Sequence, residues 1–259
     1  KASEYLNEAE VLEREKYLQI ASKDKFMPIR REALQILLRH QDSNDLPLRH
    51  LFDRHAAIRE IACKYLSTKG VDVSGKYAAL LSEKSAFRLK CAVWGIGHLR
   101  SKEYVNQIRP LLQNQYPSVR KQSLNCLSNL LGAEFDATIV EFLSDQSSSV
   151  CKEAASLVAK RPISINAQEL LDIFRHSPFD HTKNACFGIA RRENKWEALI
   201  FLISVMASRN PFSKNLTDKI DDALRLWDMA FNKSSSQPSE KQISALRACR
   251  IGLEHGARG

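Results

Sequence analysis

The stretch "PSVRKQSLNCL", residues 117–127, decides the fold because the chain contains several stretches with the same pattern. They are PIRREALQIL (28–37), AIREIACKYL (57–66), AFRLKCAVWG (86–95), SVCKEAASLV (149–158) and HTKNACFGIA (181–190). Aligned on Ile29, Ile58, Phe87, Val119, Val150 and Thr182 as position zero, the six copies follow one another at intervals of 29, 29, 32, 31 and 32 residues. Self-similarity at such a period is the sequence signature of a repeat architecture.

Two aligned positions indicate that each copy is an amphipathic helix. Position +4 is always small: Ala33, Ala62, Cys91, Ser123, Ala154 and Cys186. Position +7 is always apolar: Ile36, Tyr65, Trp94, Cys126, Leu157 and Ile189. Positions 0, +4 and +7 form one stripe of a helix of period 3.6, and the small residue at +4 lets a neighbouring helix approach closely.

A basic residue recurs at position +1 and a short polar residue recurs five positions before zero. The first set is Arg30, Arg59, Arg88, Arg120, Lys183 and, as an exception, Cys151; the second is Asp24, Asp53, Ser82, Asn114, Asp145 and Ser177. Short polar side chains bond free backbone donors at turns. We therefore expect Arg120 and its equivalents to bond a turn acid or carbonyl, which explains the paired cations of the opening stretch without a separate anion site.

Shorter amphipathic segments lie between the copies, near residues 9–21, 46–52, 77–81, 104–112, 135–143 and 167–174, so each repeat is predicted to be a helix pair. After residue 192 the spacing loosens. Helices are expected at 196–207, 217–231 and 239–253, as a terminal repeat that closes the stack. The predicted organisation is residues 1–195 as repeats and 196–259 as a divergent cap of the same solenoid.

The repeated columns resemble the HEAT-repeat family, particularly its short bacterial form with the pattern "D…VR..A...L", from Asp24 to about Arg192. The resemblance implies an all-α fold, a right-handed α-α superhelix of about six to seven helix pairs. The family includes scaffolds, regulators, chaperones, DNA glycosylases and bilin lyases, so it does not specify a function.

Composition limits the chemistry. The six cysteines show no metal-site spacing, and we expect them to be reduced, buried side chains of a cytoplasmic protein. The sequence has no phosphate loop, nucleophile elbow or dinucleotide fingerprint, so we expect no catalytic residues, no metal and no cofactor. The net charge of +9 permits an acidic partner or a nucleic acid.

The third copy differs from the others at the positions predicted to face outward. With 0, +4 and +7 buried, positions +2, +6 and +9 face away from the core, and here they are Leu89, Val93 and Ile96, beside Trp94. Either neighbouring side chains cover these residues, or they form an exposed apolar strip that receives a partner. The basic residues expected around the strip are Lys64, Lys90, Lys121 and Lys152.

The sequence thus favours a non-enzymatic scaffold that holds an acidic or amphipathic segment of another protein in the concave groove, which the second helices of such repeats line. The alternative is a basic nucleic-acid-binding protein similar to HEAT-like DNA glycosylases, whose binding is sensitive to salt. A third alternative, an enzyme similar to bilin lyases, rests on the fold resemblance alone.

Overall fold

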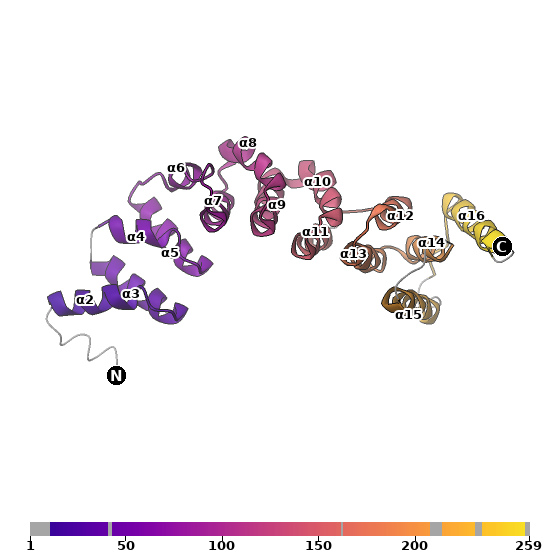
Figure 1. Ribbon diagram of the computed structural model, residues 1–259, viewed down its shortest axis with the longest axis horizontal. Helices are drawn as coiled ribbons and strands as arrows, with labels where there is room; N and C mark the ends of the chain where they lie inside the picture. Colours follow the sequence, from indigo (N-terminus) through magenta and orange to yellow (C-terminus); the bar gives the residue numbers. More distant parts are fainter. Residues whose placement is uncertain (1–10, 41–42, 162, 208–213, 231–234, 257–259) are drawn as a thin grey trace. The chain divides into compact units, whose positions relative to one another are not determined.

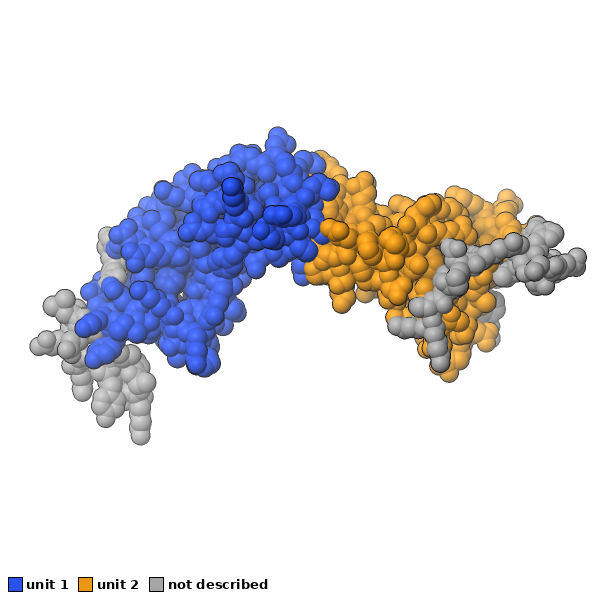
Figure 2. All heavy atoms as spheres, in the orientation of Figure 1, with its two compact units in different colours: residues 1–126 blue, residues 127–259 orange. Residues whose placement is uncertain are grey.

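The computed structural model describes residues 11–40, 43–161, 163–207, 214–230 and 235–256. Over these residues every regular element is helical, which confirms the predicted all-α fold. The chain divides into two compact units, Lys1–Cys126 and Leu127–Gly259, coloured separately in Figure 2. The predicted boundary near residue 195 stays a prediction.

The first unit consists of helix pairs in which a short first helix precedes a longer second helix (Figure 1). Its elements are α2 (Val11–Ala21), α3 (Met27–His40), α4 (Asp45–His50), α5 (Ala56–Thr68), α6 (Val73–Ala78), α7 (Ala86–His98), the 3-10 turn η1 (Lys102–Tyr104), α8 (Val105–Ile108), η2 (Arg109–Gln113) and α9 (Pro117–Leu131), within which the unit ends. The partners α2 and α3, α4 and α5, and α6 and α7 pack against each other, and α3 also packs against α5.

The second unit continues the pairing. Its elements are η3 (Gly132–Phe135), α10 (Asp136–Glu141), η4 (Phe142–Ser144), α11 (Ser148–Lys160), α12 (Ala167–His176), α13 (Asp180–Ala190), α14 (Lys195–Met206), α15 (Lys214–Ala230) and α16 (Glu240–Gly256). Helix α11 packs against α10 and α13, and α14 packs against α12, α15 and α16. Each expected segment overlaps a helix, although α6 begins four residues before the predicted one and ends at Ala78. Residues 9, 10 and 231 of the expected segments lie outside the described residues.

A side-chain hydrogen bond fixes the turn before most second helices, the helices α3, α5, α7, α9, α11 and α13 that carry the repeated stretch. The side chain five positions before zero accepts from the backbone N–H two residues later. These pairs are Asp24 with Phe26 (2.7 Å), Asp53 with His55 (2.7 Å), Asn114 with Tyr116 (3.0 Å), Asp145 with Ser147 (2.7 Å) and Ser177 with Phe179 (3.2 Å). The recurring polar residue therefore determines where each of these helices starts.

The recurring arginine closes the same turn, as predicted. Arg120 Nη1 donates to the carbonyl of Asn114 (2.9 Å), and Arg59 Nη1 donates to that of Asp53 (2.7 Å). Arg30 does the same at Asp24 (2.8 Å) and also forms a bidentate pair, both bonds 2.9 Å, with Asp53 of the next repeat. All three arginines are buried, so these bonds are shielded from water.

The structure corrects the alignment of the third copy by one residue. The second helices begin at Met27, Ala56, Ala86, Pro117, Ser148 and Asp180, and in the other five copies position zero is the third helical residue. Position zero of the third copy is therefore Arg88, not Phe87, and the intervals become 29, 30, 31, 31 and 32 residues. The residue five positions before zero is then Glu83, which pairs with Arg88 (2.9 Å). Leu89 occupies position +1, where most other copies have an arginine.

In the corrected register the core consists of positions +4, +5 and +8. They are Ala33, Leu34 and Leu37; Ala62, Cys63 and Leu66; Ala92, Val93 and Ile96; Ser123, Leu124 and Leu127; Ala154, Ala155 and Val158; Cys186, Phe187 and Ala190. All are buried except Ala155, which is half-buried. Position +4 is small in every copy, as predicted, whereas the predicted position +7 is only half-buried at Ile36 and Tyr65.

The cysteines behave as small apolar residues, as predicted. Five of the six are buried, Cys249 is half-buried, and none forms a disulfide. Burial raises the pKa of Cys126 and of Cys186 to about 12, so both thiols stay protonated at neutral pH.

Gly95 of α7 gives Tyr77 of α6 the space to enter the core. The Tyr77 side chain is fully buried, and its hydroxyl donates to the carbonyl of Leu51 at 3.0 Å. A Cβ at Gly95 would lie 2.1 Å from Tyr77 Cε2, closer than any real contact. Gly188 of α13, by contrast, has no atom within 4 Å of the corresponding position.

We expect Gly95→Ala to lower the free energy of unfolding by about 1–3 kcal/mol, because overpacking at Tyr77 exceeds the gain in helix propensity. The matched control, Gly188→Ala, should raise it by about 0.5–1 kcal/mol, because that helical site is open. Urea denaturation measures both, and a stabilised Gly95→Ala protein would contradict the packing described for Tyr77.

His50 makes the first repeat junction sensitive to acid. Burial lowers the pKa of His50 below its ordinary 6.5, although Asp53, whose Oδ2 lies 3.9 Å from His50 Nδ1, opposes the shift. Burial raises the pKa of Asp53, but hydrogen bonds from Arg30 and the His55 N–H outweigh it and hold that pKa below 3.8. Both groups bind protons more readily in the unfolded chain.

The melting temperature should therefore fall as the pH drops below about 6.5, where the unfolded chain protonates His50, and again below about 3.8 as it protonates Asp53. His50→Gln should remove part of the dependence between pH 7 and 5, whereas His176→Gln, at an exposed site, should retain it. Thermal melts across this range provide the measurement. Equal pH dependence in wild type and His50→Gln would show that His50 is not the cause.

Candidate functional site

The predicted apolar strip is not on the surface. Leu89, Val93 and Ile96 are 3%, 0% and 0% exposed, so the prediction that they form an exposed apolar strip is wrong. In the corrected register they occupy positions +1, +5 and +8, which are buried in the other copies except at Ala155 and Lys183, both half-buried. The first of the two interpretations from sequence, in which neighbouring side chains cover them, is the correct one.

Trp94 does lie on the outer side of α7, but its ring contacts two neighbouring side chains. The Arg59 guanidinium carbon is 4.2 Å from the centre of the Trp94 ring, and the His98 ring stacks on Trp94 at 4.9 Å with an angle of 9°. An arginine over a tryptophan is a favourable cation–π arrangement. Trp94 thus joins α5 to α7.

Positions +2, +6 and +10 form the outer face of the second helices. Position +2 is Arg31, Glu60, Lys90, Lys121, Lys152 and Asn184; position +6 is Gln35, Lys64, Trp94, Asn125, Ser156 and Gly188; position +10 is Arg39, Thr68, His98, Asn129, Lys160 and Arg192. None of these residues is buried, and most are polar. These positions are therefore the ones at which the second helices are accessible to solvent.

All four predicted basic residues lie on this outer face. Lys64 and Lys121 are exposed, and Lys90 is half-buried, with its Nζ 5.8 Å from the centre of the Phe87 ring. These three belong to the first unit, whereas the exposed Lys152 belongs to the second. Their part in partner binding stays a prediction.

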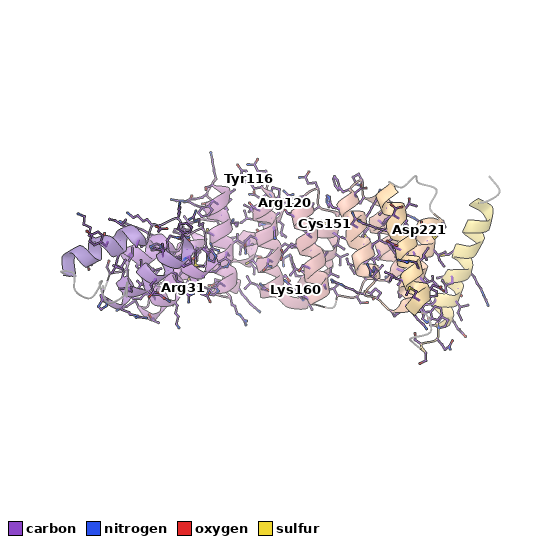
Figure 3. All side chains as sticks on the ribbon, turned by 90° about the horizontal axis from the view of Figure 1, so that it is seen from below. Arg31, Tyr116, Arg120, Cys151, Lys160 and Asp221 are labelled. Atoms are coloured by element: carbon purple, nitrogen blue, oxygen red, sulfur yellow. The ribbon has the colours of Figure 1, made fainter. Side chains whose placement is uncertain are left out.

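In the second unit a groove of about 940 Å³ runs between the outer faces of α11 and α13. Its rim carries Lys152, Lys160 and Arg192, together with the polar Ser156 and Asn184. Figure 3 labels Cys151 and Lys160 at opposite ends of α11. Because Lys152 directly follows Cys151, the groove extends along most of this helix. No carboxylate is among the described residues that line it.

Small residues open the groove. Ala155, Ala159, Ala185 and Gly188 lie where larger side chains would fill the space between α11 and α13. Gly188 is exposed, with open space around the direction of a Cβ. The sequence shows these small residues, but only the packing of α11 against α13 brings those of one copy beside those of the next.

His181 closes one end of the groove. Its Nε2 lies 2.9 Å from the carbonyl oxygen of Asp145, which can only accept, so Nε2 carries the proton of this bond. Its ring stacks on Phe179 at 5.2 Å. His181 is therefore held in place by the turn before α11 and by the start of its own helix. Both contacts favour a structural role for the ring.

The described residues contain no group of three or more His, Cys, Asp or Glu side chains that could hold a metal ion. Among the same residues, no helix has both the length and the apolar content that crossing a membrane requires.

Comparison with known proteins identifies a structural relative. No family model matches the sequence, and no curated protein matches it. The X-ray structure of YibA from Escherichia coli is similar, with a TM-score of 0.52 and 15% identity over 95% of this chain and 94% of that one. A designed armadillo repeat protein in complex with the peptide (KR)4 gives a TM-score of 0.33 and 16% identity over 92% and 98% of the two chains. The YibA match agrees with the all-α fold, and at this identity it shows the fold alone.

We expect Val93→Asp to lower the free energy of unfolding by about 3 kcal/mol or more, because it places a carboxylate without a partner in the core of α7. Lys64→Asp, on the exposed part of α5, should change it by no more than about 0.5 kcal/mol. Thermal or urea denaturation distinguishes the two. A Val93→Asp protein as stable as wild type would show that Val93 lies on the surface, as the sequence predicted.

Proposed function

We propose that this chain is a non-catalytic binding module that holds an acidic segment of another protein in the α11–α13 groove. The observation that supports the proposal is the concentration of Lys152, Lys160 and Arg192 around an open groove whose described lining contains no acid. A floor of small residues allows the backbone of a bound segment to approach both helices. Such a site needs no reacting group, and the expectation that the protein is not an enzyme stays a prediction.

The geometry of α11 specifies the spacing of the acids. Lys152 and Lys160 are eight residues apart on one helix, which corresponds to about 12 Å along its axis. An extended chain advances about 3.3 Å per residue, so two carboxylates about four residues apart reach both amines. Ser156 and Asn184 lie between the charged ends and can bond the peptide backbone.

The probe for this proposal is a fluorescein-labelled ten-residue peptide with two Glu residues four positions apart, compared with its Gln analogue. Fluorescence anisotropy should show that the Glu peptide binds and that Lys152→Glu/Lys160→Glu weakens binding by about tenfold or more, because each pair becomes repulsive. The control, Arg225→Glu/Lys241→Glu, makes the same change in net charge on exposed residues outside the groove and should retain the affinity.

A steric variant tests the groove without changing its charge. Gly188→Leu should fill the space between α11 and α13 and weaken the Glu peptide by about tenfold while the melting temperature is maintained. Equal binding of the Glu and Gln peptides would contradict the proposal. Tighter, salt-sensitive binding of duplex DNA that the Lys152→Glu/Lys160→Glu variant abolishes would favour the nucleic-acid alternative instead.

A further inference from the structure

A second cluster of basic side chains lies at the junction of the first two repeats. A depression of about 490 Å³ opens between the turn that joins α2 to α3 and the turn that joins α4 to α5. Its basic side chains are Lys23, Lys25, Arg30, Arg49 and Arg54, and its carboxylates are Asp24 and Asp53. It lies in the first unit and is independent of the α11–α13 groove.

One of the two carboxylates is paired with a cation and only one is left to offset the others, so the depression keeps a net positive charge. Asp53 receives both bonds of Arg30 at 2.9 Å and the His55 N–H at 2.7 Å. Asp24 accepts from the Phe26 N–H at 2.7 Å. Arg30 is thereby paired, whereas Lys23, Lys25, Arg49 and Arg54 are exposed around the depression and supply an excess of positive charge.

A buried donor lies within the same depression. His50 is 8% exposed and lines the depression, yet its Nδ1 is 3.9 Å from Asp53 Oδ2, too far for a hydrogen bond. The His50 ring can therefore bond a ligand in the depression. Arg54 Nη2 donates to the carbonyl of Lys25, which holds the two turns together and leaves the other guanidinium hydrogens for a ligand.

The repeat fold does not require this concentration of charge. Lys23 and Lys25 lie six and four positions before position zero. The same positions hold Gln113 and Gln115 in the fourth copy, and Ser144 and Gln146 in the fifth. The turns of those copies form the same side-chain hydrogen bonds without the lysines.

From these observations we propose that the depression binds a phosphate group, with Lys23, Arg49 and Arg54 pairing with its oxygens and His50 donating from below. Arginine and lysine arranged around one point suit a compact dianion with several acceptor oxygens. A free phosphate and a phosphorylated serine side chain both present this group. Isothermal titration calorimetry at about 150 mM NaCl, where long-range attraction is screened, tests it.

The probes are inorganic phosphate, a phosphoserine peptide and the same peptide without phosphate. We expect phosphate-containing probes to bind wild type and Lys23→Ala/Arg49→Ala to weaken them about tenfold, with no binding of the unphosphorylated peptide. The control is Arg31→Ala/Arg39→Ala, which removes two exposed cations from the outer face of α3 (Figure 3 labels Arg31) and should retain the affinity.

The two phosphate probes also distinguish the source of the group. A phosphoserine peptide that binds more tightly than inorganic phosphate assigns the site to a modified protein, and equal affinities assign it to the free ion. Absence of binding by both, or an equal loss in the Arg31→Ala/Arg39→Ala control, overturns the proposal. Because these residues lie in the first unit, failure here leaves the Glu-peptide result for the groove unaffected.

Discussion

The hydrogen bond between a turn side chain and the backbone two residues later determines the phase of each second helix in which it forms. It fixes the first helical residue, and the first residue determines which positions face the core, because every later side chain is 100° further around the axis. Asp24, Asp53, Asn114, Asp145 and Ser177 all form this bond. The buried arginine that donates to the same turn in three copies then prevents the helix from shifting along its axis.

The third copy shows that the start of the helix is harder to predict from the sequence when this hydrogen bond is absent. Its turn residue is Glu83, which pairs with Arg88 instead of the backbone, so the sequence offers Ser82 as an equally plausible alignment. Cys91 and Ala92 are both small, and either satisfies position +4. A helix that is apolar on most sides gives no periodic signal to choose between them. The error of one residue turned core side chains into an apparent surface strip.

The helix pairs, the small residue at +4, the arginine contacts and the buried cysteines could therefore be predicted from single copies. The α11–α13 groove could not, because it depends on Ala155 and Ala159 of one copy lying opposite Ala185 and Gly188 of the next. The covering of Trp94 by Arg59 is also a contact between copies. Lys152 was predicted to bind a partner and does line the groove, whereas Lys160 and Arg192 lie at position +10, one residue beyond the position +9 that the sequence analysis assigned to the outer face.

The bonds of Arg30 and Arg88 differ in what they connect. Arg30 reaches Asp53 in the following repeat, whereas Arg88 pairs with Glu83 at the start of its own helix. Opening α3 therefore leaves the Asp53 carboxylate without its cation, so we expect the first two repeats to exchange their amide hydrogens with solvent as one cooperative block. The link from the second repeat to the third combines the Arg59 guanidinium over the Trp94 ring with the buried hydrogen bond from the Tyr77 hydroxyl to the Leu51 carbonyl. Local opening at the first junction thus separates a shielded ion pair, whereas opening at the second separates a cation–π contact and a neutral hydrogen bond.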